Sequence, residues 1–255
     1  MKLLFPMVGL VILLVGCALP STSTQMGPID VHIPYIAAPV LLDGKISPFE
    51  WEGAWVTNGS FEIHDGGLTD GSYPFSLWIA GDETRFYVAV RIANMGHDPY
   101  SPPNGVLPDH VDIYFAMPTG PLAVPSDFIG LSHQWEYGSG TEDGYWNGTD
   151  WVLQNDMAPS DYDDGYITGG RWARSSFEGS VIDCEFVIYR TSPLKDYDGL
   201  QVAGPGAFNM AVRLIRPPPL DADQPFGIHS DIFPPSKNAN ATSEPSGWLR
   251  LSFDA

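Results

Sequence analysis

The chain has 255 residues, of which 44% are hydrophobic, and its formal net charge is −19. The hydrophobic content excludes a wholly disordered chain, and the negative charge disfavours nucleic acid and anionic membranes as partners, because they repel it. The 27 Gly and 24 Pro are spread along the sequence, which favours many short strands over long helices.

Residues 1–16 have the pattern of a secretory signal peptide, in which Lys2 precedes an apolar run too short to span a membrane. The last residues of this stretch form Leu-Val-Gly-Cys, which resembles a lipobox ending at Cys17. We therefore expect residues 17–26 to be a lipidated Ser/Thr-rich tether. The protein would be secreted and anchored to the membrane only through Cys17, facing the periplasm or the cell exterior. An ordinary signal peptide that ends near a cysteine is the alternative.

Alternation of apolar and polar residues predicts a series of strands in the rest of the chain. Phe75–Ile79 and Arg85–Ile92 are separated by turn residues and have the pattern of a hairpin. Further strands are expected at His110–Met117, Asp127–Trp135, Val181–Tyr189, Phe208–Ile215 and Trp248–Phe253. The stretches 93–108, 136–170 and 216–247 are expected to be long loops. These features predict an all-β antiparallel sandwich that forms a single domain over residues 27–255.

Each expected strand has one apolar face, to which Val88, Val111 and Ile113 belong, and one polar face. We expect the apolar faces to form the core and the polar faces to lie in solvent. Arginines, carboxylates and tyrosines are interleaved on the polar faces, which is compatible with a binding site on part of them. An ordinary solvated sheet surface is the other interpretation.

Two groups of residues have the composition of binding sites. The aromatic-rich stretch that contains Trp135 and Trp146 could stack on sugar rings, although the same side chains could also pin loops onto the sandwich. Asn94, Asp98 and Asp109 bracket one loop and could converge on Ca²⁺, with a solvated turn as the alternative. The sequence contains no Gly-x-Ser-x-Gly, Walker or His-Glu-x-x-His motif. Carboxylates are abundant, so a glycosidase with a carboxylate pair remains a further alternative.

Three further segments occur in a fixed order: Leu-Asp-Gly-Lys at 42–45 followed by Glu50-Trp51, the strand at 86–92, and Asp-His-Val-Asp-Ile-Tyr-Phe at 109–115. In this order they resemble family 9 carbohydrate-binding modules and the wider DOMON-like superfamily. The resemblance implies a β-sandwich that binds carbohydrate without catalysis. It also implies that Asp112 contacts sugar hydroxyls and that Asp109 lies near a structural calcium.

Sugar-binding members of the family clamp the sugar between two tryptophans, and this chain departs from that pattern. Only Phe233 could replace the second tryptophan, and the first has no equivalent unless Tyr100 or a loop tryptophan takes its place. The predicted carbohydrate-binding residues are Asp112, Arg91, Tyr114, Trp135, Trp146, Arg213 and Phe233.

Three other functions remain open at this stage. Some DOMON-like relatives bind haem, for which Met95, Met117 and Met210 are thioether candidates, and such a protein would carry electrons. An accessory protein associated with glycoside hydrolases in extracellular polysaccharide degradation is the second. A structural or adhesion lipoprotein is the third.

Overall fold

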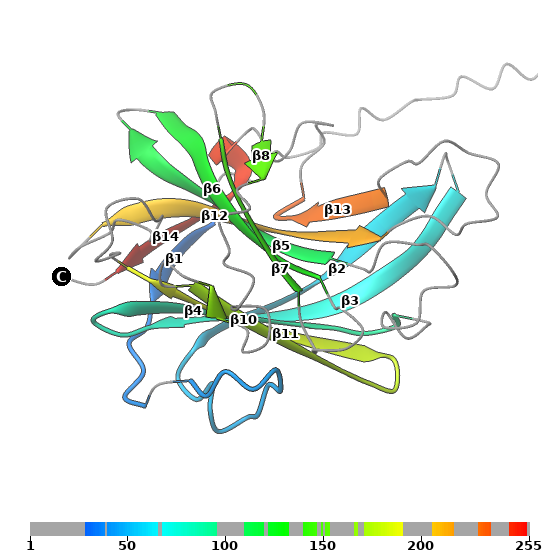
Figure 1. The fold of residues 1–255 in the computed structure, drawn as a ribbon, viewed down its shortest axis with the longest axis horizontal. Coiled ribbons are helices and arrows are strands. Elements are labelled where there is room, and N and C mark those ends of the chain that lie inside the picture. Colours follow the sequence, from blue (N-terminus) through cyan, green and yellow to red (C-terminus); the bar gives the residue numbers. More distant parts are fainter. Residues whose placement is uncertain are drawn as a thin grey trace, which may run out of the picture.

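The computed structural model shows two β-sheets stacked face to face (Figure 1). It describes residues 29–38, 40–65, 68–95, 110–119, 122–132, 140–146, 149, 151–153, 166–167, 171–190, 206–216, 229–235 and 245–253. Within these ranges the helical structure is limited to the 3₁₀ turn η3 (Pro245–Gly247). None of the described helices is long and apolar enough to cross a membrane. The predicted all-β sandwich is confirmed.

The first sheet, called sheet A, is built around β12 and β5. Its order across the sheet is β1 (Asp30–Ile33), β14 (Leu249–Phe253), β12 (Ala207–Arg216), β5 (His110–Thr119), β6 (Leu122–Ser132), β7 (Gly140–Trp146) and β8 (Trp151–Leu153). The first part of β12 pairs with β14, and its second part pairs with β13 (His229–Phe233) on the same edge. The ladder between β1 and β14 is parallel, whereas the other described ladders of sheet A are antiparallel.

The second sheet, called sheet B, is antiparallel in all of its described ladders. Its order is β2 (Trp55–Asp65), β3 (Leu68–Gly81), β4 (Arg85–Ile92), β11 (Val181–Tyr189), β10 (Arg171–Glu178) and β9 (Tyr166–Ile167). The edge strand β2 lies next to β13 of sheet A, where the backbone N–H of Glu62 donates to Asp231 Oδ2 at 2.7 Å. This contact connects the two sheets on one side of the sandwich.

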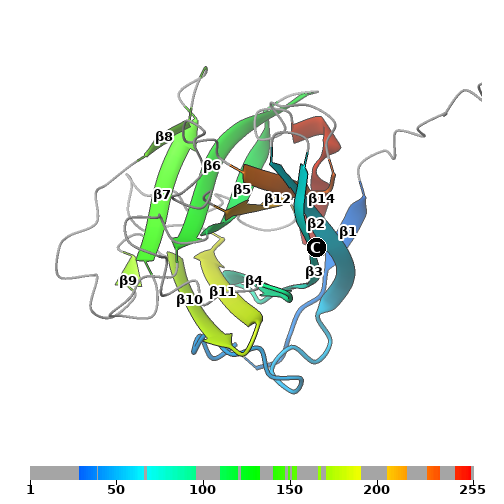
Figure 2. The ribbon, with the colours of Figure 1, turned by 90° about the vertical axis from the view of Figure 1, so that its right-hand side faces the viewer.

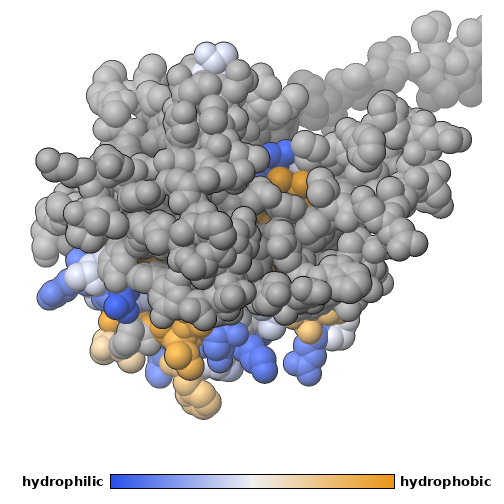
Figure 3. All heavy atoms as spheres, viewed as in Figure 1, coloured by the Kyte–Doolittle hydropathy of each residue, from blue (hydrophilic) through white to orange (hydrophobic). Residues whose placement is uncertain are grey.

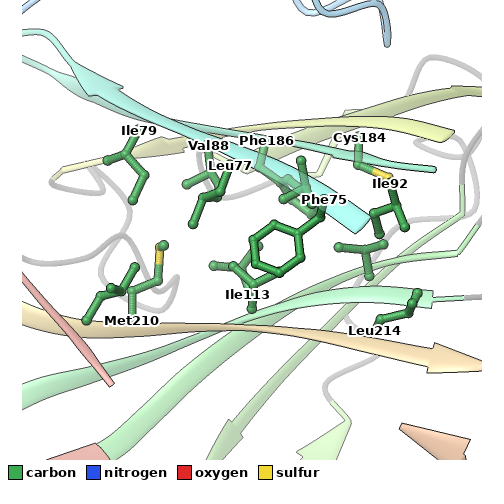
Figure 4. Close-up of a cluster of buried hydrophobic side chains, with 14 of the residues drawn as sticks. Phe75, Leu77, Ile79, Val88, Ile92, Ile113, Cys184, Phe186, Met210 and Leu214 are labelled. Carbon is green, nitrogen blue, oxygen red and sulfur yellow. The ribbon is translucent and has the colours of Figure 1, made fainter. Parts of the chain in front are cut away.

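The core lies between the sheets and consists of the faces that the alternation assigned to it. Val88 and Ile113 are 0% exposed and Val111 is 1% exposed. Figure 4 shows side chains from both sheets meeting in this layer, among them Phe186 of β11 and Met210 of β12. The predicted division of each strand into a core face and an outer face is therefore confirmed at these positions.

Several strands lie in stretches that were predicted to be loops or for which no strand was predicted. β2 contains Asn-Gly-Ser in its middle, a combination typical of turns, but Gly59 lies under the ring of Phe75. A Cβ atom on Gly59 would lie 2.6 Å from that ring, so glycine is needed there for close approach. The expectation that 136–170 and 216–247 are loops throughout is wrong, because these stretches contain strands. They are β7, β8, β9 and β13.

The outer face of sheet B is covered in part, which the sequence did not predict. Residues 40–54, called the cover segment, run across it as a third layer (Figure 2). Tyr87 and Ala89 point outward from β4, yet both are 0% exposed, because the cover segment packs Ile46 and Trp51 against this face. Figure 3 shows hydrophobic and hydrophilic side chains together on this lower side of the molecule.

Candidate functional site

A polar network crosses three neighbouring strands on the outer face of sheet A. Asp112 and Tyr114 belong to β5, Arg213 belongs to β12 and Ser230 belongs to β13. Asp112 and Arg213 lie directly opposite each other in the antiparallel ladder between β5 and β12. The register therefore gathers polar side chains that are far apart in the sequence on one patch of the sheet.

Hydrogen bonds join these four side chains into a continuous chain. The hydroxyl of Tyr114 donates to Asp112 Oδ2 at 3.0 Å. Arg213 donates from Nη1 to the Tyr114 hydroxyl oxygen at 3.2 Å and from Nη2 to Ser230 Oγ at 2.8 Å. Both terminal nitrogens of the guanidinium, Nη1 and Nη2, are thus held, which fixes its plane relative to the sheet.

The network is buried at one end and more open at the other. Asp112 and Tyr114 are each 4% exposed, whereas Arg213 and Ser230 are half-buried. Burial, reinforced by the charge of Asp112, raises the pKa of Tyr114 well above its ordinary value, although Arg213 opposes that shift. The phenol therefore stays protonated and keeps donating to Asp112. Arg213 and Ser230 are the members that a ligand can reach, and the other two hold them in place.

Apolar side chains pack around the buried end of the network. The ring of Tyr114 lies 6.2 Å from the ring of Trp248, centroid to centroid. Trp248 is 1% exposed and Ile232 is 5% exposed, and both belong to the same cluster as Tyr114. This packing keeps water away from the Tyr114–Asp112 hydrogen bond, which strengthens it.

The four residues of the network include a single carboxylate, Asp112, whereas glycoside hydrolysis uses a pair of carboxylates.

The structure brings Asp112, Tyr114 and Arg213 together, but it does not bring Arg91 to them. Arg91 lies on β4, in the other sheet, and its side chain points to the opposite outer face of the sandwich. Its Nε donates to Asp183 Oδ1 at 2.6 Å, and its Nη2 donates to Asp183 Oδ2 at 2.6 Å. Nη2 also donates to the carbonyl oxygen of Ile46 at 2.9 Å.

Phe233 lies on the core side of β13 rather than beside Asp112. It is opposite Val212, a core residue, in the ladder between β12 and β13. Its ring lies 5.0 Å from the ring of Phe75 in an edge-to-face arrangement. The hypothesis that Phe233 replaces a sugar-clamping tryptophan next to Asp112 is therefore not supported. Successive side chains of a strand point to opposite faces, so Ile232, and not Phe233, lies on the outer face of sheet A.

The other predicted site residues are described only in part. Trp135, Asp98, Asp109 and Cys17 lie outside the described residues, and Trp146 is described only by its backbone position at the end of β7. Asn94 is exposed and has a positive φ of 64°, which suits a turn.

Calcium binding is therefore still a prediction, and so is lipidation. Within the described ranges no three His, Cys, Asp or Glu side chains converge as a metal site would require. Of the haem candidates, Met95 and Met210 are both 0% exposed in the apolar core between the sheets, and Met117 lies on β5.

The Leu-Asp-Gly-Lys segment has a structural role that the sequence did not reveal. The backbone N–H of Gly44 donates to Glu185 Oε2 at 2.8 Å, and that of Asp43 donates to the same oxygen at 3.2 Å. Trp51 Nε1 donates to Glu185 Oε1 at 3.2 Å. Glu185 lies on β11, where it is 0% exposed, and burial raises its pKa to about 8. This side chain anchors the cover segment to sheet B.

Ser230, which accepts a hydrogen bond from Arg213 Nη2, was also missed in the sequence analysis. It lies in a stretch that was expected to be a loop, and only its pairing through β13 brings it to Arg213. The alternation in His-Ser-Asp-Ile-Phe at 229–233 is the one signal that could have indicated a strand there.

Comparisons with known proteins place this geometry in context. No family model matches the chain, and no curated protein matches its sequence. Two solved structures of a family 9 carbohydrate-binding module from Caldicellulosiruptor kristjanssonii, with glucose and with cellotriose, each share 12% identity and a TM-score of 0.47 with this chain. The alignments cover 89% of this chain and 96% and 94% of the two module chains.

A further solved structure is a "putative carbohydrate-binding protein" from Bacteroides uniformis. It shares 11% identity with this chain, and the alignment covers 90% of this chain and 100% of that chain with a TM-score of 0.51. At this identity the likeness concerns the fold alone. The chain is therefore a β-sandwich similar in fold to this Bacteroides uniformis protein.

Proposed function

We propose that the chain binds carbohydrate without transforming it, through the polar network on the outer face of sheet A. The observation that carries the proposal is the fixed guanidinium of Arg213, held by Tyr114 and Ser230 at the open end of the network. The fold supports the same conclusion, because the similar solved structure from Bacteroides uniformis is named for carbohydrate binding.

The chemistry of the network suits sugar hydroxyls. A hydroxyl both donates and accepts hydrogen bonds, and the half-buried Arg213 and Ser230 offer donors and an acceptor side by side. Because Asp112 and Tyr114 hold Arg213 in place, little side-chain entropy is lost when a ligand binds. Trp135 and Trp146 are the proposed stacking aromatics, since an apolar sugar face is bound by an aromatic ring.

Substitution of Arg213 tests this site. Arg213→Met keeps a long side chain but removes the guanidinium, and it should weaken glycan binding by about tenfold or more. Arg250→Met is the matched control, because Arg250 is exposed on β14 and its Nη1 lies 3.8 Å from Oδ1 of the exposed Asp30. Binding is measured on a glycan array and then by calorimetry. A wild-type protein that ignores every glycan, or an Arg213→Met variant with wild-type affinity, would refute the proposal.

The non-catalytic character and the haem alternative have direct tests. The bound glycan should be recovered intact, so release of reducing sugar by the purified protein would show an enzyme instead. A Soret band after reconstitution with haem would favour an electron carrier. Retention of the protein on polysaccharides that co-secreted hydrolases attack would support an accessory role in polysaccharide degradation.

We also propose that Cys17 is lipidated and holds the protein at the outer side of a membrane. Cys17→Ala should then release the protein into the soluble fraction, and retention of that variant in membranes would contradict the proposal. For calcium, the amide and carboxylate oxygens of Asn94, Asp98 and Asp109 are of the type that this ion prefers. A melting temperature unchanged by a chelator would exclude a stabilising ion.

A further inference from the structure

We propose a second saccharide-binding surface on the outer face of sheet B, formed by Asn58, Trp78 and Arg91 where the cover segment ends. Its ligand would be an extended chain of neutral sugars. Only the ligand class rests on the proposed function, since the two surfaces share no residue and lie on opposite sides of the sandwich.

The surface is organised by a row of polar residues that crosses four strands. Asn58 on β2 is opposite Ser76 on β3, Ser76 is opposite Arg91 on β4, and Arg91 is opposite Asp183 on β11. With about 4.8 Å between neighbouring strands, the row extends over about 14 Å. Trp78 stands two residues along β3 from Ser76, on the same face. Because Asp183 at its end is buried, the part open to a ligand runs from Asn58 to Arg91 over about 10 Å, which is enough for two sugar units of a longer chain.

The cover segment leaves this row open from Asn58 to Arg91, covers Asp183 at its end through Ile46, and buries the next row. Trp78, Ala89 and Glu185 form the adjacent row, in which Ala89 and Glu185 are 0% exposed beneath the cover segment. By contrast, the side chain of Arg91 is 41% exposed and Asn58 is exposed. The half-buried Trp78 therefore stands at the boundary between the covered and the open part of the face.

Polar groups in the open row are fixed and still have hydrogen-bonding capacity. Asp183 and the carbonyl oxygen of Ile46 engage Nε and Nη2 of Arg91. Nη1 of Arg91 has no hydrogen-bond partner in the described part of the chain. Ser76 Oγ donates to Asn58 Oδ1 at 2.6 Å, which orients the amide and leaves its N–H groups for a ligand.

Arg91 lies near the ring of Trp78 without covering it closely. The guanidinium carbon is 6.0 Å from the Trp78 ring centroid, whereas that of Arg190 stacks on Phe253 at 3.7 Å. The longer distance leaves ring surface on which the apolar side of a sugar can pack. An aromatic surface beside fixed planar donors is the combination that a sugar ring requires.

Charge selects a neutral ligand. Asp183 neutralises Arg91 through two 2.6 Å hydrogen bonds, and the whole chain carries a net charge of −19. An anionic polysaccharide would therefore be repelled over the whole surface. Two binding surfaces on opposite outer faces would let one molecule hold two chains of a neutral polysaccharide.

The test compares variants of each surface on immobilised neutral glucans, xylans and mannans, by affinity electrophoresis of the mature protein. Asn58→Ala removes an exposed amide with one described hydrogen bond, and Trp78→Ala removes the ring; each should weaken retention by about threefold to tenfold. Arg213→Met disables the sheet A surface, and Arg250→Met is the common control. Because Trp78 also packs against the cover segment, the Asn58 variant keeps the test valid if Trp78→Ala unfolds.

The outcomes separate the two proposals. Weaker retention of the sheet B variants, further reduced by combination with Arg213→Met, supports the second surface. Wild-type retention of Asn58→Ala, with loss in Arg213→Met, overturns the second surface and leaves the first. Loss in Asn58→Ala with wild-type retention of Arg213→Met supports the second surface and overturns the first. A wild-type protein retained by none of the polysaccharides overturns both.

Discussion

Gly44 offers the sharpest test of how the cover segment is held. Its φ is +81°, a conformation that side chains with a Cβ rarely adopt, and a Cβ atom there would lie 2.8 Å from the backbone carbon and oxygen of Ser175. Backbone atoms within a sheet cannot move aside as a flexible side chain can. The Gly44→Ala substitution must therefore push the segment away from β10 and from Glu185, to which the Gly44 N–H donates.

The expected cost follows from two terms. The left-handed backbone conformation costs alanine about 1–2 kcal/mol. Displacement of the segment also weakens the hydrogen bond to the buried carboxyl group of Glu185. At pH 9, above the pKa of about 8, this group is charged and the hydrogen bond contributes about 1.5–3 kcal/mol. At that pH, Gly44→Ala should therefore lower the free energy of unfolding by about 2.5–5 kcal/mol. Loss of the second term alone should lower the melting temperature by several degrees.

Gly53→Ala is the matched control for this prediction. Gly53 has a similar φ of +85°, but a Cβ atom there would meet nothing within 4 Å. Its substitution should cost only the conformational term, about 1–2 kcal/mol. Urea unfolding of both variants and the wild type measures the difference, provided that the m-value is unchanged. If the two substitutions cost the same, close packing against β10 does not fix the segment.

Three further predictions concern stability. Burial raises the pKa of Glu185 from 4.5 to about 8, so the folded chain binds this proton more tightly than the unfolded chain. The free energy of unfolding should therefore fall as pH rises from about 4.5 to about 8, by at most about 5 kcal/mol. Urea titrations should show that Glu185→Gln lacks this component, and identical pH dependence in both proteins would contradict it. Asp183→Ala should speed amide hydrogen exchange at Ile46, whose N–H donates to Asp183, and unchanged exchange would show another acceptor. Phe86→Ala should lower the free energy of unfolding by about 3–5 kcal/mol, because Phe86 is fully buried. Phe49→Ser should change it by about 0.5 kcal/mol or less, because Phe49 is 89% exposed. Equal denaturation midpoints for the two variants would refute this contrast.

The core of the sandwich could be predicted because alternation alone decides which side chains face inward. Val88, Val111 and Ile113 alternate with polar neighbours and are buried as expected. Strand β2 could not be predicted in the same way, because Gly59 is there to accommodate a ring from the next strand. When the segment is considered alone, a glycine such as Gly59 is interpreted as part of a turn, although its role is to make room for the ring of Phe75.

The candidate site was only half predictable, for a related reason. Alternation places both Arg91 and Asp112 on outer faces, but it does not say to which sheet each strand belongs. Outer faces of opposite sheets point in opposite directions, so two correct outward assignments do not make one site. Only the pairing of β5 with β12, and of β4 with β11, separates these two residues.

The cover segment shows that dividing each strand into a core face and an outer face does not account for irregular segments that pack on an outer face. Residues 40–46 are not part of a strand, yet backbone N–H groups packed against a sheet still need acceptors. Asp183 and Glu185 accept from the N–H groups of Asp43, Gly44 and Ile46. Carboxylates on the outer side of an apolar strand therefore have two explanations, a ligand or an irregular segment of the same chain. In this chain the second applies to sheet B, because a glycine-containing segment supplies the donors. The cover segment thus accounts for both carboxylates of sheet B, so a ligand on that face would be bound by Asn58, Trp78 and the remaining donors of Arg91 rather than by Asp183 or Glu185.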